Sequence, residues 1–177
     1  MRNLCLSLIL IILLLLSACT PAVTPDDGRC ELYLQVLEDL WNIDAGLNSD
    51  NGLKYLGVDL SGLTHLSQSD RAAIARQFAG KHELILVEGT WEDLCDEGYI
   101  DRERLVWTDG ILFTITTNEE AVSSLPGANS SDGTSASTTF DAQKWRSGIG
   151  AIFLRDCTAQ RDGNGVWSYS LGRMLIS

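Results

Sequence analysis

The spacing of apolar residues predicts helices in the first half of the chain. Between residues 30 and 47, apolar side chains recur at helical intervals with acids on the opposite side, and the polar run NSDNG ends the pattern. A second helix is expected from Ser67 to a stop at Gly80, and Ser67 and Asp70 have the spacing of a capping box with Asp in the place of Glu. Thr90 and Asp93 repeat this spacing and predict a third, shorter helix.

Shorter apolar runs predict strands. LKYLGVDL and ELILVEG separate the predicted helices, and LVWTDGILFTITT contains Asp109-Gly110, a hairpin turn signal. Residues 123–138 are small, polar and aperiodic, which is typical of a loop, and they precede the runs TFDAQKW, GIGAIFLRDCTA and VWSYSLGRMLI. The last two runs are joined by the turn sequence DGNG. This order predicts an α+β fold with N-terminal helices packed on one face of a C-terminal antiparallel β-meander sheet.

The first nineteen residues have the pattern of an export signal. Arg2 precedes an apolar run from Leu4 to Leu16, which is shorter than the roughly 20 residues that a membrane-spanning helix needs. The run ends in Leu16-Ser17-Ala18-Cys19, which resembles the lipobox of bacterial lipoprotein precursors. The resemblance implies that Cys19 receives a diacylglyceryl group and that the chain is cut before it. The alternative is an ordinary secretory signal with a coincidental cysteine.

These features divide the chain into three parts. Residues 1–18 are expected to be a lipoprotein signal peptide, residues 19–29 a lipidated tether containing Pro21 and Pro25, and residues 30–177 a single α+β globular domain. Two acyl chains anchor a protein stably, whereas one holds only marginally. The protein is therefore expected at the cell membrane, lipid-anchored through Cys19 and facing the extracytoplasmic side.

Charge and cysteine content narrow the classes of function. The chain has 24 acids and 13 bases, and removal of Arg2 with the signal leaves 12 bases. Nucleic-acid binding needs a basic surface, so nucleic acid is not an expected partner. Cys30, Cys95 and Cys157 remain for folding, either as three thiols or as one disulfide and one free thiol. No C-x-x-C pair or calcium-loop spacing is present, so no metal and no cofactor are expected.

No catalytic residues can be assigned from the sequence. His65 and His82 are the two histidines, and neither a G-x-S-x-G nor an H-E-x-x-H motif occurs. Adjacent acids, such as Glu92-Asp93, are expected on a solvated helix face.

The most specific stretch is FDAQKWRSGIGAIF, residues 140–153. It places Lys144, Trp145 and Arg146 together in an otherwise acidic chain, and we take these three residues as candidate contacts for an anion or a sugar. The alternative is structural, because glycines in a strand mark a bulge or a bend and the two cations can pair with acids. Trp107, Trp145 and Trp167, all on the predicted sheet, also suggest a platform for carbohydrate.

GTWEDLCDEGYID and FDAQKWRSGIGA are similar to sequences of small uncharacterised lipoproteins of Gram-positive gut anaerobes. This resemblance supports the expected location and implies no chemistry. The sequence favours a non-catalytic binding or interaction domain of unknown ligand. The alternative is a small cell-envelope hydrolase that acts on cell-wall or carbohydrate substrates through residues that only the fold brings together.

Overall fold

The computed structural model describes residues 27–48, 52–118 and 136–177. The predicted signal peptide, Cys19 and nearly all of the predicted loop therefore lie outside the described residues. The elements are α2 (Arg29–Asn42), a 3₁₀ turn (Ala45–Asn48), β1 (Tyr55–Asp59), α3 (Gln68–Lys81), β2 (Ile85–Glu88), α4 (Trp91–Asp96), β3 (Gly110–Thr117), β4 (Ser137–Ser147), β5 (Gly150–Arg161), β6 (Trp167–Ser170) and β7 (Arg173–Ile176).

The predicted helix caps are confirmed. Ser67 Oγ accepts a hydrogen bond from Asp70 N at 3.1 Å at the start of α3. At α4 both halves of the capping box form, since Asp93 N donates to Thr90 Oγ1 and Thr90 N donates to Asp93 Oδ2. The first helix is shorter than predicted, because α2 ends at Asn42 and a 3₁₀ turn completes the segment.

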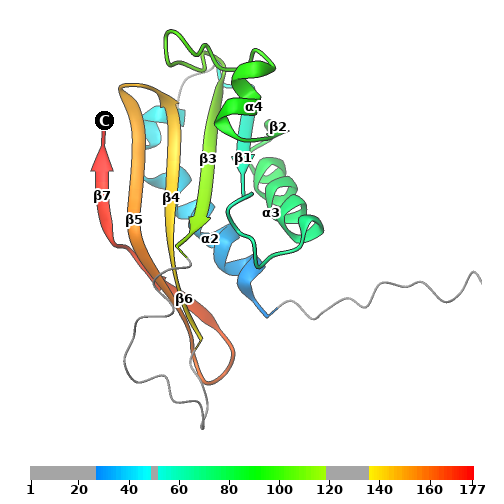
Figure 1. Cartoon of the computed structure of the whole chain (residues 1–177), viewed down its shortest axis with the longest axis vertical. Coiled ribbons are helices and arrows are strands. Elements are labelled where there is room, and N and C mark those ends of the chain that lie inside the picture. Colours follow the sequence, from blue (N-terminus) through cyan, green and yellow to red (C-terminus); the bar gives the residue numbers. More distant parts are fainter. Residues whose placement is uncertain (1–26, 49–51, 119–135) are drawn as a thin grey trace, which may run out of the picture.

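The described strands form one mixed sheet in the order β2-β1-β3-β4-β5-β6, and β7 pairs with β5 alongside β6 (Figure 1). The α+β class and the antiparallel run from β3 onward are confirmed. The sheet also has a parallel part that was not predicted, because β1 pairs in parallel with both β2 and β3. The prediction that the helices pack on one face is not borne out. Asp109-Gly110 forms no hairpin; it leads into β3, and the carbonyl of Asp109 accepts from the amides of Lys54 and Tyr55.

The helices lie on both faces of the sheet. Residues of α2 and α3 pack with Leu56, Phe113 and other side chains on one face, in the main core. α4 contributes Leu94 to a second cluster on the other face, together with Leu112 of β3 (Figure 1). The chain crosses from β1 to β2 in one direction and from β2 back past β1 to β3 in the other. Since parallel crossovers are right-handed, two crossovers in opposite directions place α3 and α4 on opposite faces.

The second cluster is built around Trp107, which is fully buried against backbone. A Cβ atom at Gly57 would lie 2.7 Å from Trp107 Cζ3, and one at Gly110 would lie 1.9 Å from Trp107 Cε2. The indole therefore occupies the space that side chains of β1 and β3 would otherwise fill. Glycine at position 110 serves this close approach and not a turn.

We expect Gly110→Ala to lower the free energy of unfolding by about 3 kcal/mol, because the added methyl group overlaps a ring that has no room to move. Gly80→Ala is the matched control, since its Cβ meets nothing within 4 Å on the exposed side of α3 and should raise stability by about 0.5–1 kcal/mol. Urea denaturation followed by circular dichroism measures both. Equal stability of the two variants would contradict this packing.

Candidate functional site

Lys144 of β4 lies on the α2 face and is completely buried. Its ammonium donates to the backbone carbonyls of Trp41 and Asp44 at 3.3 and 3.2 Å, to that of Ile43, and to Asn48 Oδ1 at 3.0 Å. These acceptors belong to the last turn of α2 and the segment after it. α2 carries no basic residue in its last turn, so Lys144 supplies the cation that a helix C-terminus favours.

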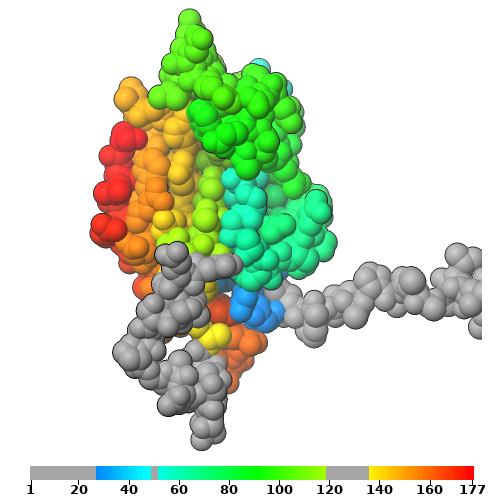
Figure 2. All heavy atoms as spheres, in the orientation of Figure 1, coloured from blue at the N-terminus to red at the C-terminus, as the bar shows by residue number. Residues whose placement is uncertain are grey.

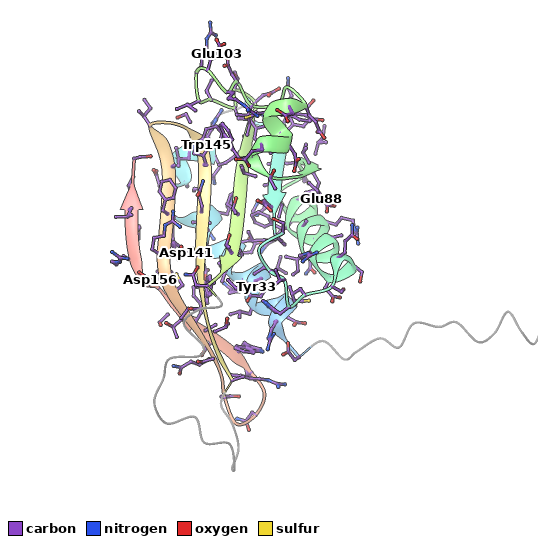
Figure 3. All side chains as sticks on the ribbon, viewed as in Figure 1. Tyr33, Glu88, Glu103, Asp141, Trp145 and Asp156 are labelled. Carbon is purple, nitrogen blue, oxygen red and sulfur yellow. The ribbon has the colours of Figure 1, made fainter. Side chains whose placement is uncertain are left out.

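Arg146 and Trp145 leave β4 in opposite directions. Arg146 donates to the carbonyl of Leu47 at 2.9 Å and to that of Thr108 at 3.0 Å, on the same face as Lys144. Trp145 belongs to the α4 face, where it meets Trp91 edge-to-face with ring centroids 6.3 Å apart (Figure 3). The structure thus does not bring the three predicted contact residues together. Gly148, with Ile149, forms the turn between β4 and β5.

The two histidines lie apart and in different surroundings. His65 is exposed, and its Nε2 is 3.2 Å from the hydroxyl of Tyr33, whose burial raises its pKa to about 12. His82 stacks on Trp41 and places Nε2 3.3 Å from Glu38 Oε2, and burial lowers the pKa of His82. This histidine–carboxylate pair is the nearest approach to acid–base machinery among the described residues, and no serine hydroxyl is bonded to it.

Metal and disulfide chemistry receive no support from the described residues. Cys30, Cys95 and Cys157 form no disulfide with one another in the structure, which favours the alternative of three thiols. Burial raises the pKa of the Cys157 thiol, which keeps it protonated. In the described part of the chain, no three His, Cys, Asp or Glu side chains gather as metal ligands.

A groove of about 720 Å³ lies between the first half of α2 and β6, and we call it the α2–β6 groove. Leu32, Trp167 and Tyr169 form its apolar lining, whereas Glu31 and Gln35 are exposed. Its lining residues are Gly28, Glu31, Leu32, Gln35, Gly165, Val166, Trp167, Ser168 and Tyr169. Its size suits a small ligand.

Hydrogen bonds hold the two aromatic rings of the groove in place. Trp167 Nε1 donates to the carbonyl of Asp27 at 2.9 Å, and the guanidinium of Arg29 lies 5.3 Å from the centre of the same ring. Tyr169 donates to Asp39 Oδ2 at 2.6 Å. Burial, followed by this bond to Asp39, raises the pKa of Tyr169, so its hydroxyl stays a donor. The groove is therefore preformed.

A smaller pocket of about 220 Å³ lies where β1 and β2 end and α3 and α4 begin. Its polar groups serve local turns and caps: Asp59 accepts from Ser61, Asp93 caps with Thr90, and Arg71 donates to the carbonyl of Leu63. Few of these groups remain to recognise a ligand, so the α2–β6 groove is the better candidate site.

The sequence pointed to Trp167 only as one of three tryptophans on the predicted sheet. Trp107 and Trp145 are buried, and Trp167 alone of the three lines the groove. Its partners on α2 are more than 130 residues earlier in the chain, so no local pattern joins them. The alternation of Trp167 and Tyr169 with Ser168 and Ser170 is a signal from which one aromatic face of this strand could have been predicted. No family model, curated protein or solved structure matched the chain.

We expect Lys144→Met to lower the free energy of unfolding by about 2 kcal/mol, because the carbonyl of Ile43 loses its ammonium donor. The carbonyls of Trp41 and Asp44 each lose one of two donors and keep the other. Lys54→Met is the control, since the exposed Lys54–Asp109 pair should contribute about 0–1 kcal/mol. Chemical denaturation at pH 7 measures both. Similar losses in the two variants would contradict a capping role for Lys144.

The difference in stability between the wild type and Lys144→Met should change with pH in a defined direction. Burial lowers the pKa of Lys144 to about 8 from 10.5, so between these values the unfolded chain binds more protons than the folded one. The titration of Lys144 therefore adds stability as the pH rises from 8 to 10.5. The stability of the wild type relative to Lys144→Met should increase over this range in denaturation curves, and a decrease would contradict the lowered pKa.

Proposed function

We propose that this protein is a membrane-anchored extracytoplasmic lipoprotein with a non-catalytic binding domain. The anchor is inferred from the lipobox-like sequence Leu16-Ser17-Ala18-Cys19, which follows a short apolar run. No helix in residues 27–48, 52–118 or 136–177 is long and apolar enough to cross a membrane. The proposal places the protein at the cell membrane, held by acyl chains on Cys19.

The α2–β6 groove is the proposed binding site, and it lies where the proposed tether meets the folded part of the chain. The bond from Trp167 to the carbonyl of Asp27 joins the start of the folded part to the groove. Asp27 follows Cys19 by eight positions along the chain, which span at most about 28 Å. A ligand in the groove would therefore be held near the outer surface of the membrane.

The lining of the groove favours a neutral polar ligand with an apolar face, such as a sugar ring. The half-buried rings of Trp167 and Tyr169 offer a surface for C–H groups, while Gln35 and Glu31 offer hydrogen-bonding groups at the rim. The carboxylate of Glu31 disfavours an anion. This proposal differs from the contact at Lys144, Trp145 and Arg146, whose two cations already bind backbone carbonyls.

A cell-envelope hydrolase is the second candidate, and one observation favours it. His82 and Glu38 form a close pair beside Trp41, and a lowered pKa keeps His82 available as a base near pH 7. Neither His82 nor Glu38 lines the α2–β6 groove or the smaller pocket at the ends of β1 and β2. The binding function is therefore the better supported.

Metabolic labelling with a fatty acid tests the anchor. We expect the wild-type chain to incorporate label and to fractionate with membranes, and Cys19→Ser to lose both, because the acyl groups need the Cys19 thiol. Cys30→Ser is the matched control and should keep its label. Equal labelling of wild type and Cys19→Ser would end the lipoprotein proposal.

Titration of the unlipidated chain, from residue 19 with Cys19→Ser, tests the groove. Soluble cell-wall glycan fragments should shift the indole resonance of Trp167 in a nitrogen–proton correlation spectrum, and Trp167→Ala should weaken binding at least tenfold. Trp145→Phe is the control, because its ring lies on the other face. A glycan and anion panel that leaves the Trp167 resonance unmoved would reject the groove. If the wild type shortens the glycan fragments and Glu38→Gln does not, the hydrolase is favoured.

A further inference from the structure

The edge formed by β7 is unusually apolar. Of the exposed large apolar side chains in the described residues, four lie between Leu171 and Ile176, and a fifth, Ile149, is in the turn beside this edge. Met174, Leu175 and Ile176 are 47, 54 and 66 % exposed. Figures 1 and 2 show β7 in red along the border of the sheet.

The exposure of β7 follows from where the helical layer ends. Met174 and Ile176 stand opposite Leu154 and Ile152 of β5, so they point to the α2 face. Leu154 and Ile152 are buried there, but their neighbours on β7 are not, since the layer of α2 stops short of the edge. Leu175 stands opposite Phe153 and points to the other face.

The outer hydrogen-bonding groups of β7 are available. Ala151 and Ser177 exchange backbone hydrogen bonds, so the alternation of an antiparallel ladder makes Leu175 a bonded partner of Phe153. The N–H and C=O groups of Met174 and Ile176 consequently point away from β5. In the described residues no strand pairs with this outer side.

β7 also lacks the usual protection of an edge. Natural edge strands carry proline, lysine, bulges or inward charges that discourage pairing. The one charged residue of β7 is Arg173, and Asp156 on β5 already holds its guanidinium at 2.6 and 3.1 Å (Figure 3 labels Asp156). Residues 171–177 contain no acid, in a chain with a formal charge of −11.

We propose that β7 pairs with β7 of a second copy of this chain, antiparallel and about a two-fold axis through Leu175. In this register Leu175 faces Leu175 of the other copy, and Met174 exchanges backbone hydrogen bonds with Ile176. Since 174 and 176 are the positions whose backbone groups point outward, the ladder continues without a break across the two chains.

The register is self-complementary in side chains as well as in backbone. Met174 and Ile176 both face the α2 side of their own sheet, and the two-fold axis keeps that side common to both copies. Every apolar side chain of the strand thus meets an apolar one, and Arg173 meets Ser177, so no like charges are opposed. A pairing shifted by two residues would leave Met174 or Ile176 facing its own equivalent and part of the strand unmatched.

The size of the interface predicts a weak dimer. The exposed area of the five apolar side chains is roughly 500 Å² per chain, so a symmetric dimer would bury at most about 1,000 Å², at or below the low end of specific interfaces. In dilute solution, association in the micromolar range or weaker is expected. Confinement to a membrane, which rests on the proposed function, would raise the local concentration and strengthen the dimer.

Analytical ultracentrifugation of the unlipidated chain tests self-pairing independently of the anchor. From about 10 µM to about 1 mM we expect the sedimentation coefficient to rise from that of a monomer towards that of a dimer. Leu175→Arg and Leu175→Glu should each raise the dissociation constant at least tenfold, because like charges then meet at the two-fold axis. Gln160→Arg, at an exposed position of β5 outside the segment that β7 pairs with, is the control and should associate as the wild type does.

Mixing the two oppositely charged variants tests the register directly. An equimolar mixture of Leu175→Arg and Leu175→Glu should associate at least as well as the wild type, because residue 175 of one copy faces residue 175 of the other. Leu175 is half-exposed, so neither variant should lose its fold, which circular dichroism checks. A mixture that associates no better than its components overturns the proposal. So does a wild type that stays a monomer at about 1 mM, which would leave the edge to a strand of another protein.

Discussion

The handedness of two parallel crossovers determines how this molecule is layered. The chain leaves β1 for β2 in one direction and returns past β1 to β3 in the other, so α3 and α4 must cover opposite faces. Two apolar clusters result, and β3 contributes to both of them. This strand also joins the two halves of the sheet, since it pairs in parallel with β1 on one side and antiparallel with β4 on the other.

Lys144 and Arg146 then join the antiparallel half to the segment that follows α2. Both cations reach backbone carbonyls about a hundred residues earlier in the chain, where a helix end and a 3₁₀ turn leave acceptors unpaired. A basic pair in an acidic protein invites a functional interpretation. Here burial and hydrogen bonding explain the pair structurally, and the candidate site moves to the groove beside β6.

The groove, the proposed tether and the exposed edge of β7 form a coherent organisation. The α2–β6 groove opens where the chain enters the fold at Asp27, close in chain length to Cys19. The apolar edge of β7 lies on the same antiparallel half, beside β6 on β5. The proposed ligand capture near a membrane and the proposed weak pairing between neighbours are compatible, because they use different surfaces of one sheet.

Local chemistry by itself determined the helix caps at Ser67 and Thr90 and most of the strands, because each depends on residues a few positions apart. The lipobox-like pattern at Cys19 is equally local, and the membrane location that it implies is a prediction. The parallel pairing of β1, the burial of Lys144 and the meeting of Trp167 with α2 were decided only by the tertiary structure. They depend on crossover handedness and on contacts between residues about a hundred positions apart, and a one-dimensional pattern of apolar and polar residues carries neither.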